Sequence, residues 1–302
     1  MVLQPRGFSI GAAVAMAALA CACGTQTSRS GEKGDVPVRA ASDDPARDAG
    51  PVSARLLADV SHVAPGQEFL LGLALDVDDG WYIHWTHPGD GGEGTRVSAQ
   101  TPPGFAPEAP RFPGPDRIEA DDGGVRFGYR ESALVSIPVV ASDSISETEI
   151  ELSVEAEWMA CRAGVCEHGR GAPRVALPVA TPEAPSRPAH RERFDGHRRR
   201  LPAGLETAEG IATSWQPAGE GRIELAIEVS GAADVSFFPE RDLELIGHAT
   251  TPADGGKALR LWLDSDAGGR AAGVIRLIRE GEVEYLRVDL EVPDRAGEAT
   301  GF

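Results

Sequence analysis

The strongest constraint on the fold is a strict alternation of side chains between residues 149 and 158. The apolar members are Ile150, Leu152, Val154, Ala156 and Trp158, and glutamates and one serine stand between them. Because successive side chains of a β-strand point to opposite faces, this segment predicts a strand with one buried and one solvated face. Residues 69–77 and 133–139 repeat the period. We therefore expect one antiparallel β-sandwich over residues 53–180.

A second region, residues 206–294, has the same character. Alternating apolar segments begin at Ile223 and Leu259, and residues 279–282 predict a hairpin turn. The chain contains 36 glycines and 23 prolines, which favours turn-rich β-structure over helices. The expected fold class is therefore all-β, with two antiparallel β-sandwich domains in tandem.

A connector over residues 181–205 separates the two sandwiches. Its later half predicts a short helix whose last turn is basic, at Arg198–Arg200. Such a cluster can bind an anion, but it more often caps a helix or pairs with acidic neighbours, which is the interpretation we favour. Residues 295–302 are expected to form a tail.

The first 23 residues predict an export signal. Arg6 precedes an apolar stretch that is too short to span a bilayer comfortably, and small residues then lead into two cysteines. We expect lipidation at Cys23 or Cys21, with plain secretion as the alternative. Residues 24–52 contain few apolar side chains and predict a disordered tether. The expected location is the periplasm or outer cell envelope.

The net charge of -18 narrows the classes of partner. An acidic surface repels phosphates, so we expect no nucleic-acid binding. No other segment is apolar and long enough to cross a bilayer, so membrane contact is expected only through an N-terminal lipid anchor. Outside the cytoplasm, disulfides form and persist.

The remaining two cysteines, Cys161 and Cys166, follow the alternating strand and flank a short turn. Their spacing permits a disulfide and leaves three interpretations open: a structural staple, a redox couple, or a metal site completed by His168. Because Trp158 belongs to the buried face, Cys161 is expected on the opposite, glutamate-bearing face. A disulfide built there would be accessible.

An aromatic and glycine-rich segment, residues 79–95, predicts a strand that runs into a wide turn. His84 and His87 are three residues apart, which on a strand is only a weak metal signal. The loop lacks the Lys-Ser/Thr ending of a phosphate-binding loop. No Ser/His/Asp arrangement or distinct carboxylate pair suggests hydrolytic chemistry. We expect no metal and no cofactor.

Taken together, the motifs resemble those of the N-terminal periplasmic domain of the thiol:disulfide interchange protein DsbD and of the related suppressor-of-copper-sensitivity membrane reductases. The resemblance covers about residues 53–180. The matching segments are Gly80–Trp85, Pro88–Gly91, Thr95, Pro102–Phe105, Arg111–Pro115, Phe127–Tyr129, Ile137–Pro138, Trp158–Cys161 and Cys166. In the second region, Phe237–Glu240 is similar to the β domain that follows in the copper-sensitivity branch.

The resemblance implies immunoglobulin-like sandwiches and a redox-active pair, Cys161 and Cys166, on a hairpin. In such a pair one cysteine attacks a partner disulfide and the other resolves the mixed disulfide. The residues implied to line the site are Tyr82, His84, Phe127, Tyr129 and Trp158. Trp158 would pack beneath the hairpin, and residues 121–129 would form a cap loop that shields the pair.

The implied function is thiol–disulfide exchange with thioredoxin-fold periplasmic proteins, as an oxidoreductase of the protein-disulfide reductase type. The membrane and thioredoxin-like domains of the full-length relatives are expected to be absent, so the electron donor would be a separate membrane protein. Glu167 and His168 stand where many relatives have a proline, so the turn and the partner surface are expected to differ. The alternatives are a non-catalytic envelope binding module with a structural disulfide and a copper- or zinc-handling lipoprotein.

Overall fold

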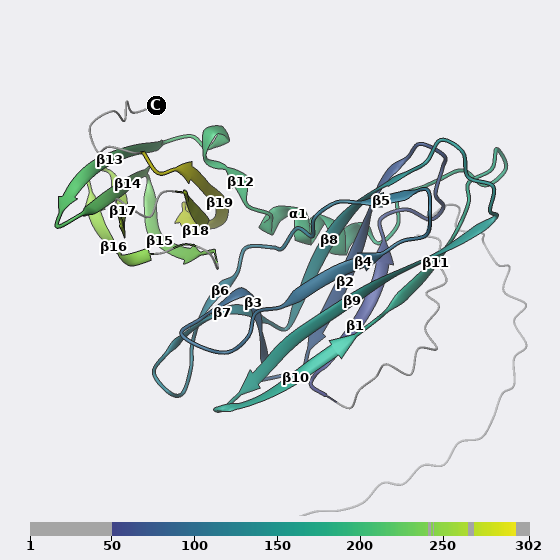
Figure 1. The fold of residues 1–302 in the computed structure, drawn as a ribbon, viewed down its shortest axis with the longest axis horizontal. Coiled ribbons are helices and arrows are strands. Elements are labelled where there is room, and N and C mark those ends of the chain that lie inside the picture. Colours follow the sequence, from purple (N-terminus) through teal and green to yellow (C-terminus); the bar gives the residue numbers. More distant parts are fainter. Residues whose placement is uncertain (1–49, 241–242, 244, 265–268, 294–302) are drawn as a thin grey trace, which may run out of the picture. The chain divides into compact units, whose positions relative to one another are not determined.

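The computed structural model describes residues 50–240, 243, 245–264 and 269–293 (Figure 1). The expected signal segment, residues 24–49 of the expected tether and the expected tail lie outside the described residues. Within the described residues, no helix is both long enough and apolar enough to cross a membrane.

The first sandwich is built from strands β1 to β11. Their bounds are β1 Val52–Ala58, β2 Glu68–Val77, β3 Tyr82–Gly89, β4 Arg96–Gln100, β5 Phe105–Pro107, β6 Asp116–Glu119, β7 Val125–Arg130, β8 Ser132–Ala141, β9 Glu149–Arg162, β10 Val165–Gly171 and β11 Arg174–Pro178. One sheet has the order β1-β2-β8-β5 and the other the order β10-β9-β3-β7-β6. The ladders between these strands are antiparallel.

Strand β9 organises the second sheet because each of its edges pairs with two strands. On one edge, β11 pairs with its first part and β10 with its last part. On the other edge, β4 pairs with residues 153–157 and β3 with residues 160–161. The alternating segment seen in the sequence, residues 149–158, is the first part of a 14-residue strand, and the last part of this strand carries Cys161 to the end of the sheet.

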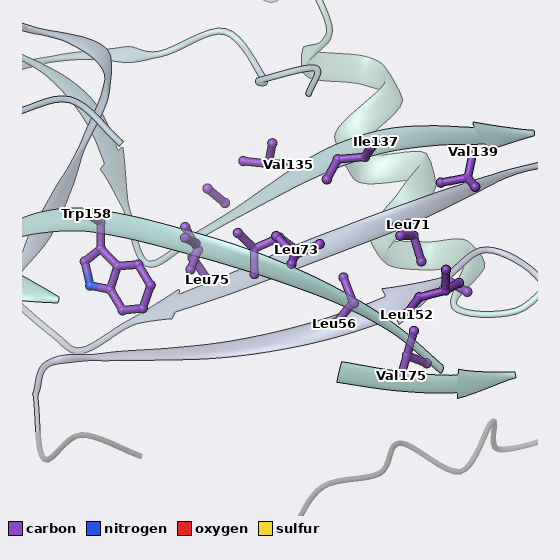
Figure 2. Close-up of a cluster of buried hydrophobic side chains, with 14 of the residues drawn as sticks. Leu56, Leu71, Leu73, Leu75, Val135, Ile137, Val139, Leu152, Trp158 and Val175 are labelled. Carbon is purple, nitrogen blue, oxygen red and sulfur yellow. The ribbon is translucent and has the colours of Figure 1, made fainter. Parts of the chain in front are cut away.

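The core of the first sandwich lies between its two sheets (Figure 2). The alternating apolar side chains of β2, β8 and β9 face one another there, and most are fully buried. The ten labelled in Figure 2 are Leu56, Leu71, Leu73, Leu75, Val135, Ile137, Val139, Leu152, Trp158 and Val175. Burial of these side chains supplies the main driving force for the sandwich.

The connector contains helix α1, Arg191–Arg200, which packs on β8 of the first sandwich. Phe194 is fully buried against Ala74 and Leu134. Arg198 pairs with Asp195, and Arg200 pairs with Asp116 at 3.0 Å. Two of the three arginines in the basic last turn therefore pair with acidic neighbours, as favoured from the sequence.

The second sandwich begins with strand β12 Ala203–Gly204, and a short 3-10 helix, η1 Leu205–Thr207, stands between β12 and the other strands. The other strands are β13 Ile211–Gly219, β14 Arg222–Ser230, β15 Ala232–Pro239, β16 Leu245–Ala253, β17 Gly256–Asp264, β18 Arg270–Arg279 and β19 Glu282–Glu291. The sheet orders are β12-β19-β18-β15 and β13-β14-β17-β16. Its own core contains the alternating residues of β14 and β17, and the predicted hairpin joins β18 to β19.

The predicted fold class is confirmed: the described chain is nearly all β, in two sandwiches of antiparallel sheets. A departure is the two-residue pairing of β12 with β19, which is parallel.

Candidate functional site

The two cysteines meet because β9 and β10 form a tight hairpin. Arg162 pairs with Val165, so the turn consists of Ala163 and Gly164 alone. Both turn residues have positive φ angles, 49° and 77°, as a two-residue type I′ turn requires. Gly164 adopts this conformation without steric cost, which explains its place between the cysteines. This turn sets the register that places Cys161 directly opposite Cys166.

Cys161 and Cys166 form a disulfide, with their Cα atoms 4.1 Å apart. Paired residues on neighbouring antiparallel strands project to the same face, so the bond needs no change in the path of the chain. The bond links two adjacent strands of one sheet rather than the two sheets of the sandwich. It therefore adds little to the sandwich's cohesion.

The two sulfur-bearing residues differ sharply in exposure. Cys161 is 2% exposed, whereas Cys166 is exposed. Cys161 lies on the face opposite Trp158, as expected, and the disulfide is accessible there, but only at Cys166, because Cys161 itself is buried. Tyr82 of β3 is the register partner of Cys161, and Tyr82, Ile118 and Met159 cover it in a small apolar cluster. Only the Cys166 end of the disulfide is open to an incoming partner.

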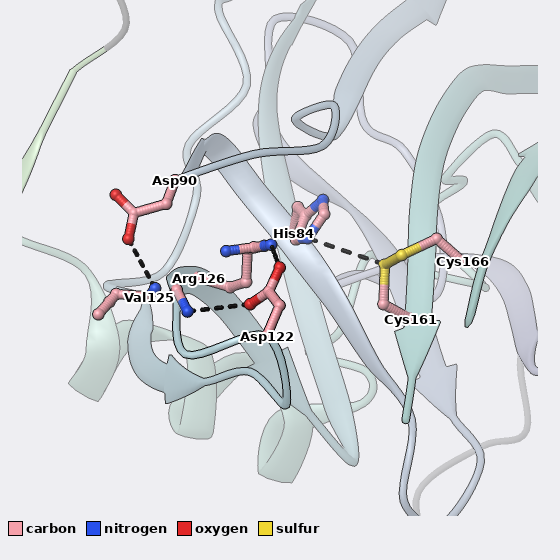
Figure 3. A network of polar contacts seen from close by, with 8 residues as sticks. His84, Asp90, Asp122, Val125, Arg126, Cys161 and Cys166 are labelled. Carbon is pink, nitrogen blue, oxygen red and sulfur yellow. Dashed lines mark hydrogen bonds and ion pairs between the residues drawn. A yellow bond between two sulfur atoms is a disulfide. The ribbon is translucent and has the colours of Figure 1, made fainter. Parts of the chain in front are cut away.

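His84 lies directly beside the buried sulfur. Its Nε2 atom is 4.0 Å from Cys161 Sγ, and its side chain is 1% exposed (Figure 3). On the other side of the ring, Nδ1 is 2.9 Å from the backbone carbonyl oxygen of Glu93. Burial lowers the pKa of His84; the Glu93 hydrogen bond opposes this shift, and the positive charge of Arg126 adds to it.

The loop after β3 holds the His84 ring in place. Thr95 Oγ1 donates to the carbonyl oxygen of His84 at 2.5 Å, and the Thr95 N–H donates to the carbonyl of Trp85 at 2.9 Å. Gly92 has a φ angle of 95°, and a Cβ atom there would lie 2.3 Å from Cε1 of His84. Only glycine allows the loop to approach the ring so closely.

A cleft of about 330 Å³ opens beside Cys166, lined also by Asp121, Asp122, Arg126 and Arg162. Arg126 donates from Nη2 to Asp122 at 2.6 Å. The Gly124 N–H and Arg126 lower the pKa of the Asp122 carboxyl group by hydrogen bonding. Charged groups of both signs therefore surround the exposed sulfur.

The segment that lines this cleft is tied to the loop after β3. Asp90 accepts a hydrogen bond from the Val125 N–H at 2.7 Å and donates its own N–H to the Val125 carbonyl at 2.8 Å (Figure 3). Residues 119–122 and Arg126 thus face Cys166. Shielding of the pair by the predicted cap loop stays a prediction.

Three of the five predicted lining residues lie away from the disulfide. The Phe127 ring contacts His87, with ring centroids 5.8 Å apart. Tyr129 is buried and donates its hydroxyl to the Pro113 carbonyl at 2.7 Å. Trp158 belongs to the core on the opposite face of β9, where it packs against Gly169 of β10, beneath the hairpin as predicted. Tyr82 and His84 contact the Cys161 side of the bond, so the structure brings together only these two with the cysteines.

Several residues at the site were not predicted individually, although Arg126 belongs to the predicted cap loop of residues 121–129. Ile118 and Met159 cover Cys161, and Arg126 and Arg162 line the cleft. Arg162 directly follows Cys161 in the sequence, a signal that was available. Within the described residues, no group of three or more His, Cys, Asp or Glu side chains is arranged to hold a metal ion.

Residues 53–171 match the family model described as "Thiol:disulfide interchange protein DsbD, N-terminal". No curated protein matches the chain. Among solved structures, the N-terminal periplasmic domain of ScsB from Proteus mirabilis is similar, with 15% sequence identity and a TM-score of 0.57. That match covers 83% of this chain and 96% of the other.

A second solved structure, a protein of unknown function from Porphyromonas gingivalis W83, is 14% identical over 80% of this chain and 100% of its own, with a TM-score of only 0.24. The ScsB likeness shows a shared fold, and the family model matches the part of the chain that carries the disulfide. Residues 53–171 form a domain of the DsbD N-terminal type, and this supports a role as a thiol–disulfide exchange module.

Proposed function

We propose that this protein exchanges disulfides with thioredoxin-fold partners in the cell envelope through Cys161 and Cys166, drawing electrons from a separate membrane protein. Residues 53–180 would be the exchange domain and residues 206–294 an accessory sandwich. The observation that carries the proposal is the asymmetry of the disulfide. An exposed Cys166 beside a cleft and a buried Cys161 suit the two successive steps of exchange.

In the reducing direction, the Cys166 thiolate attacks one sulfur of a partner disulfide. A mixed disulfide forms, and the partner's other sulfur leaves as a thiolate. Cys161 then attacks Cys166 Sγ, the intermolecular bond breaks, and the partner's second sulfur leaves as a thiolate. The partner gains two electrons and the Cys161–Cys166 disulfide is restored. The exposure of Cys166 supports its role as the sulfur that meets the partner.

A purely structural disulfide is the weaker explanation. The two cysteines are five residues apart in sequence, so the bond closes a very short loop. In the chain-entropy model, stabilisation grows with loop length, so this bond would constrain the unfolded chain less than a long-range bridge would. A purely structural disulfide also does not require a cleft beside its exposed cysteine.

We further propose that the exchange domain is exported and tethered to the membrane by lipid at Cys23 or Cys21. The sequence before residue 50 supports this, through its apolar stretch and polar spacer. The similar ScsB structure is a periplasmic domain, which is consistent with export of this chain.

The equilibrium reduction potential of the Cys161–Cys166 pair tests the proposed function. Titration of the full chain against glutathione or dithiothreitol buffers is expected to give a value between about -120 and -270 mV, the range of thioredoxin-fold redox proteins. A value below about -300 mV is typical of structural disulfides and would contradict the proposal. A Cys161→Ser, Cys166→Ser double variant provides the baseline for the titration signal.

A further inference from the structure

The His84 ring connects the backbone of one loop to the buried sulfur of the disulfide. Its Nδ1 atom is 2.9 Å from the carbonyl oxygen of Glu93, and a carbonyl oxygen can only accept a hydrogen bond. Nδ1 must therefore carry a proton. In the neutral ring the other nitrogen, Nε2, then has a free lone pair, and this atom is the one that faces Cys161 Sγ at 4.0 Å.

The surroundings of the ring favour its neutral form. Burial lowers the pKa of His84, and the positive charge of Arg126 lowers it further. The groups that face the ring come from every element packed on it: Tyr82 on its own strand, Arg126 paired with Asp122, the Glu93 carbonyl and Cys161. Between pH 6.5 and 8, Nε2 is thus available to accept a proton.

We infer that His84 is the base that accepts the proton of Cys161 when this cysteine resolves a mixed disulfide on Cys166. The inference rests on the proposed function, because it assigns a residue to the second step of that exchange. Nothing else within the described contacts of Cys161 offers a proton acceptor: its apolar neighbours are Tyr82, Ile118 and Met159, and the Tyr82 phenol has a raised pKa because it is partly buried.

The proton transfer takes place in the mixed disulfide between Cys166 and the external sulfur. The Cys161 S–H proton moves to Nε2 of His84, and the freed electron pair on Cys161 Sγ forms the bond to Cys166 Sγ. The bond between Cys166 and the external sulfur breaks, and that sulfur leaves with the electron pair as a thiolate. The imidazolium then loses its proton to solvent or to the departing thiolate. In the reverse direction, the imidazolium protonates Cys161 as it leaves.

Such a base is needed because Cys161 is buried. An ordinary thiol has a pKa of about 8.5, and burial in apolar surroundings raises it further. At pH 7 a thiol at 8.5 is only about 3% thiolate. Without a neighbouring proton acceptor, only the thiolate fraction of Cys161 could react, and the resolving step would be slow. Its rate would rise tenfold with each pH unit below the pKa of the thiol.

Ellman's reagent separates the two steps without any protein partner. With the reduced full chain carrying Cys21→Ser and Cys23→Ser, so that Cys161 and Cys166 are its two thiols, Cys166 attacks the reagent first and releases one thionitrobenzoate, and Cys161 then expels the second from the Cys166 adduct. We expect His84→Phe and His84→Gln to leave the first release unchanged and to slow the second at least about tenfold at pH 7. The rate of the second release should be nearly independent of pH between 6.5 and 8 in the parent, whereas in the variants this rate should rise with pH.

The pH profile distinguishes a proton-accepting role from a packing role, because a residue that only packs would change rates without changing the profile. Gly92→Ala keeps the histidine but its Cβ would displace the ring, so it should slow the second release in the same way. Near-ultraviolet circular dichroism of the oxidised proteins shows whether each His84 variant is folded like the parent. If a His84 variant is not, Gly92→Ala tests the inference in its place.

Parental rates and a parental pH profile in these variants would overturn the inference. Failure of the proposed function gives a different result: no exchange with thioredoxin, or a reduction potential below about -300 mV, in the parent protein itself.

Discussion

Cys161→Ser is expected to accumulate a stable mixed disulfide with thioredoxin almost completely, whereas Cys166→Ser is expected to form almost none. The exposed Cys166 sulfur can reach a partner, but Cys161 is 2% exposed beneath Tyr82, Ile118 and Met159. These variants and their control all carry Cys21→Ser and Cys23→Ser, so that no other thiol of the chain reacts. The probe is a thioredoxin that retains only its exposed active-site cysteine, activated as a thionitrobenzoate adduct. Non-reducing electrophoresis measures the complex.

The wild-type chain provides the matched control for this trap. Its Cys161 should resolve the complex, so the intermolecular disulfide appears only transiently and free thioredoxin is recovered. In urea, Cys166→Ser should react as well as Cys161→Ser, because unfolding removes the cover from Cys161. Equal trapping by both variants in the folded state would contradict the assignment of Cys166 as the attacking sulfur.

The sequence predicted the fold well where the signal was local. The alternation from Ile150 to Trp158 determines which face of β9 is buried, because a strand has a period of two. It also placed Cys161 on the face opposite Trp158. The two-residue turn at Ala163 and Gly164 was not recognised, although it is what aligns the cysteines.

The site was harder to predict because its contacts are long-range. Whether Cys161 is exposed depends on its pairing with Tyr82, 79 positions earlier by residue number, and on Ile118 from another strand. The His84 and Cys161 contact likewise spans a separation of 77 residues. The resemblance also implied that Phe127 and Tyr129 line the site, but an aromatic position alone does not tell which neighbours its side chain contacts: Phe127 contacts His87, and Tyr129 donates to the Pro113 carbonyl.

A second histidine, His197, makes the fold sensitive to acid. It lies on α1, is 3% exposed, and forms a 2.7 Å hydrogen bond through Nε2 with Ser136 Oγ on β8. Burial, reinforced by the positive charge of Arg198, lowers its pKa from 6.5 to about 4. Charging this imidazole while it is packed against β8 is therefore unfavourable, and α1 is the element that the charge would displace.

The free energy of unfolding is expected to fall by about 3 kcal/mol through His197 as the pH drops from about 6.5 to about 4. In this window the unfolded chain binds a proton at His197 and the folded chain does not, so acid favours unfolding; below about pH 4 both are protonated and the loss is complete. Burial also lowers the pKa values of His84 and His248, so these two histidines further lower the free energy of unfolding in acid. Urea unfolding at pH 7, 5.5 and 4 measures the effect.

His197→Gln should remove this share of the pH dependence while the other buried histidines keep theirs, because glutamine can hydrogen bond to Ser136 but does not titrate. His168→Gln, at an exposed position on β10, is the matched control and should leave the parent's pH dependence in place. If the free energy of unfolding of His197→Gln depends on pH as steeply as that of the parent, then α1 of the parent moves away in acid. The His197 imidazolium is then hydrated without unfolding of the sandwich. Docking of α1 on β8 would then be a weak contact that acid can open separately from the rest of the domain.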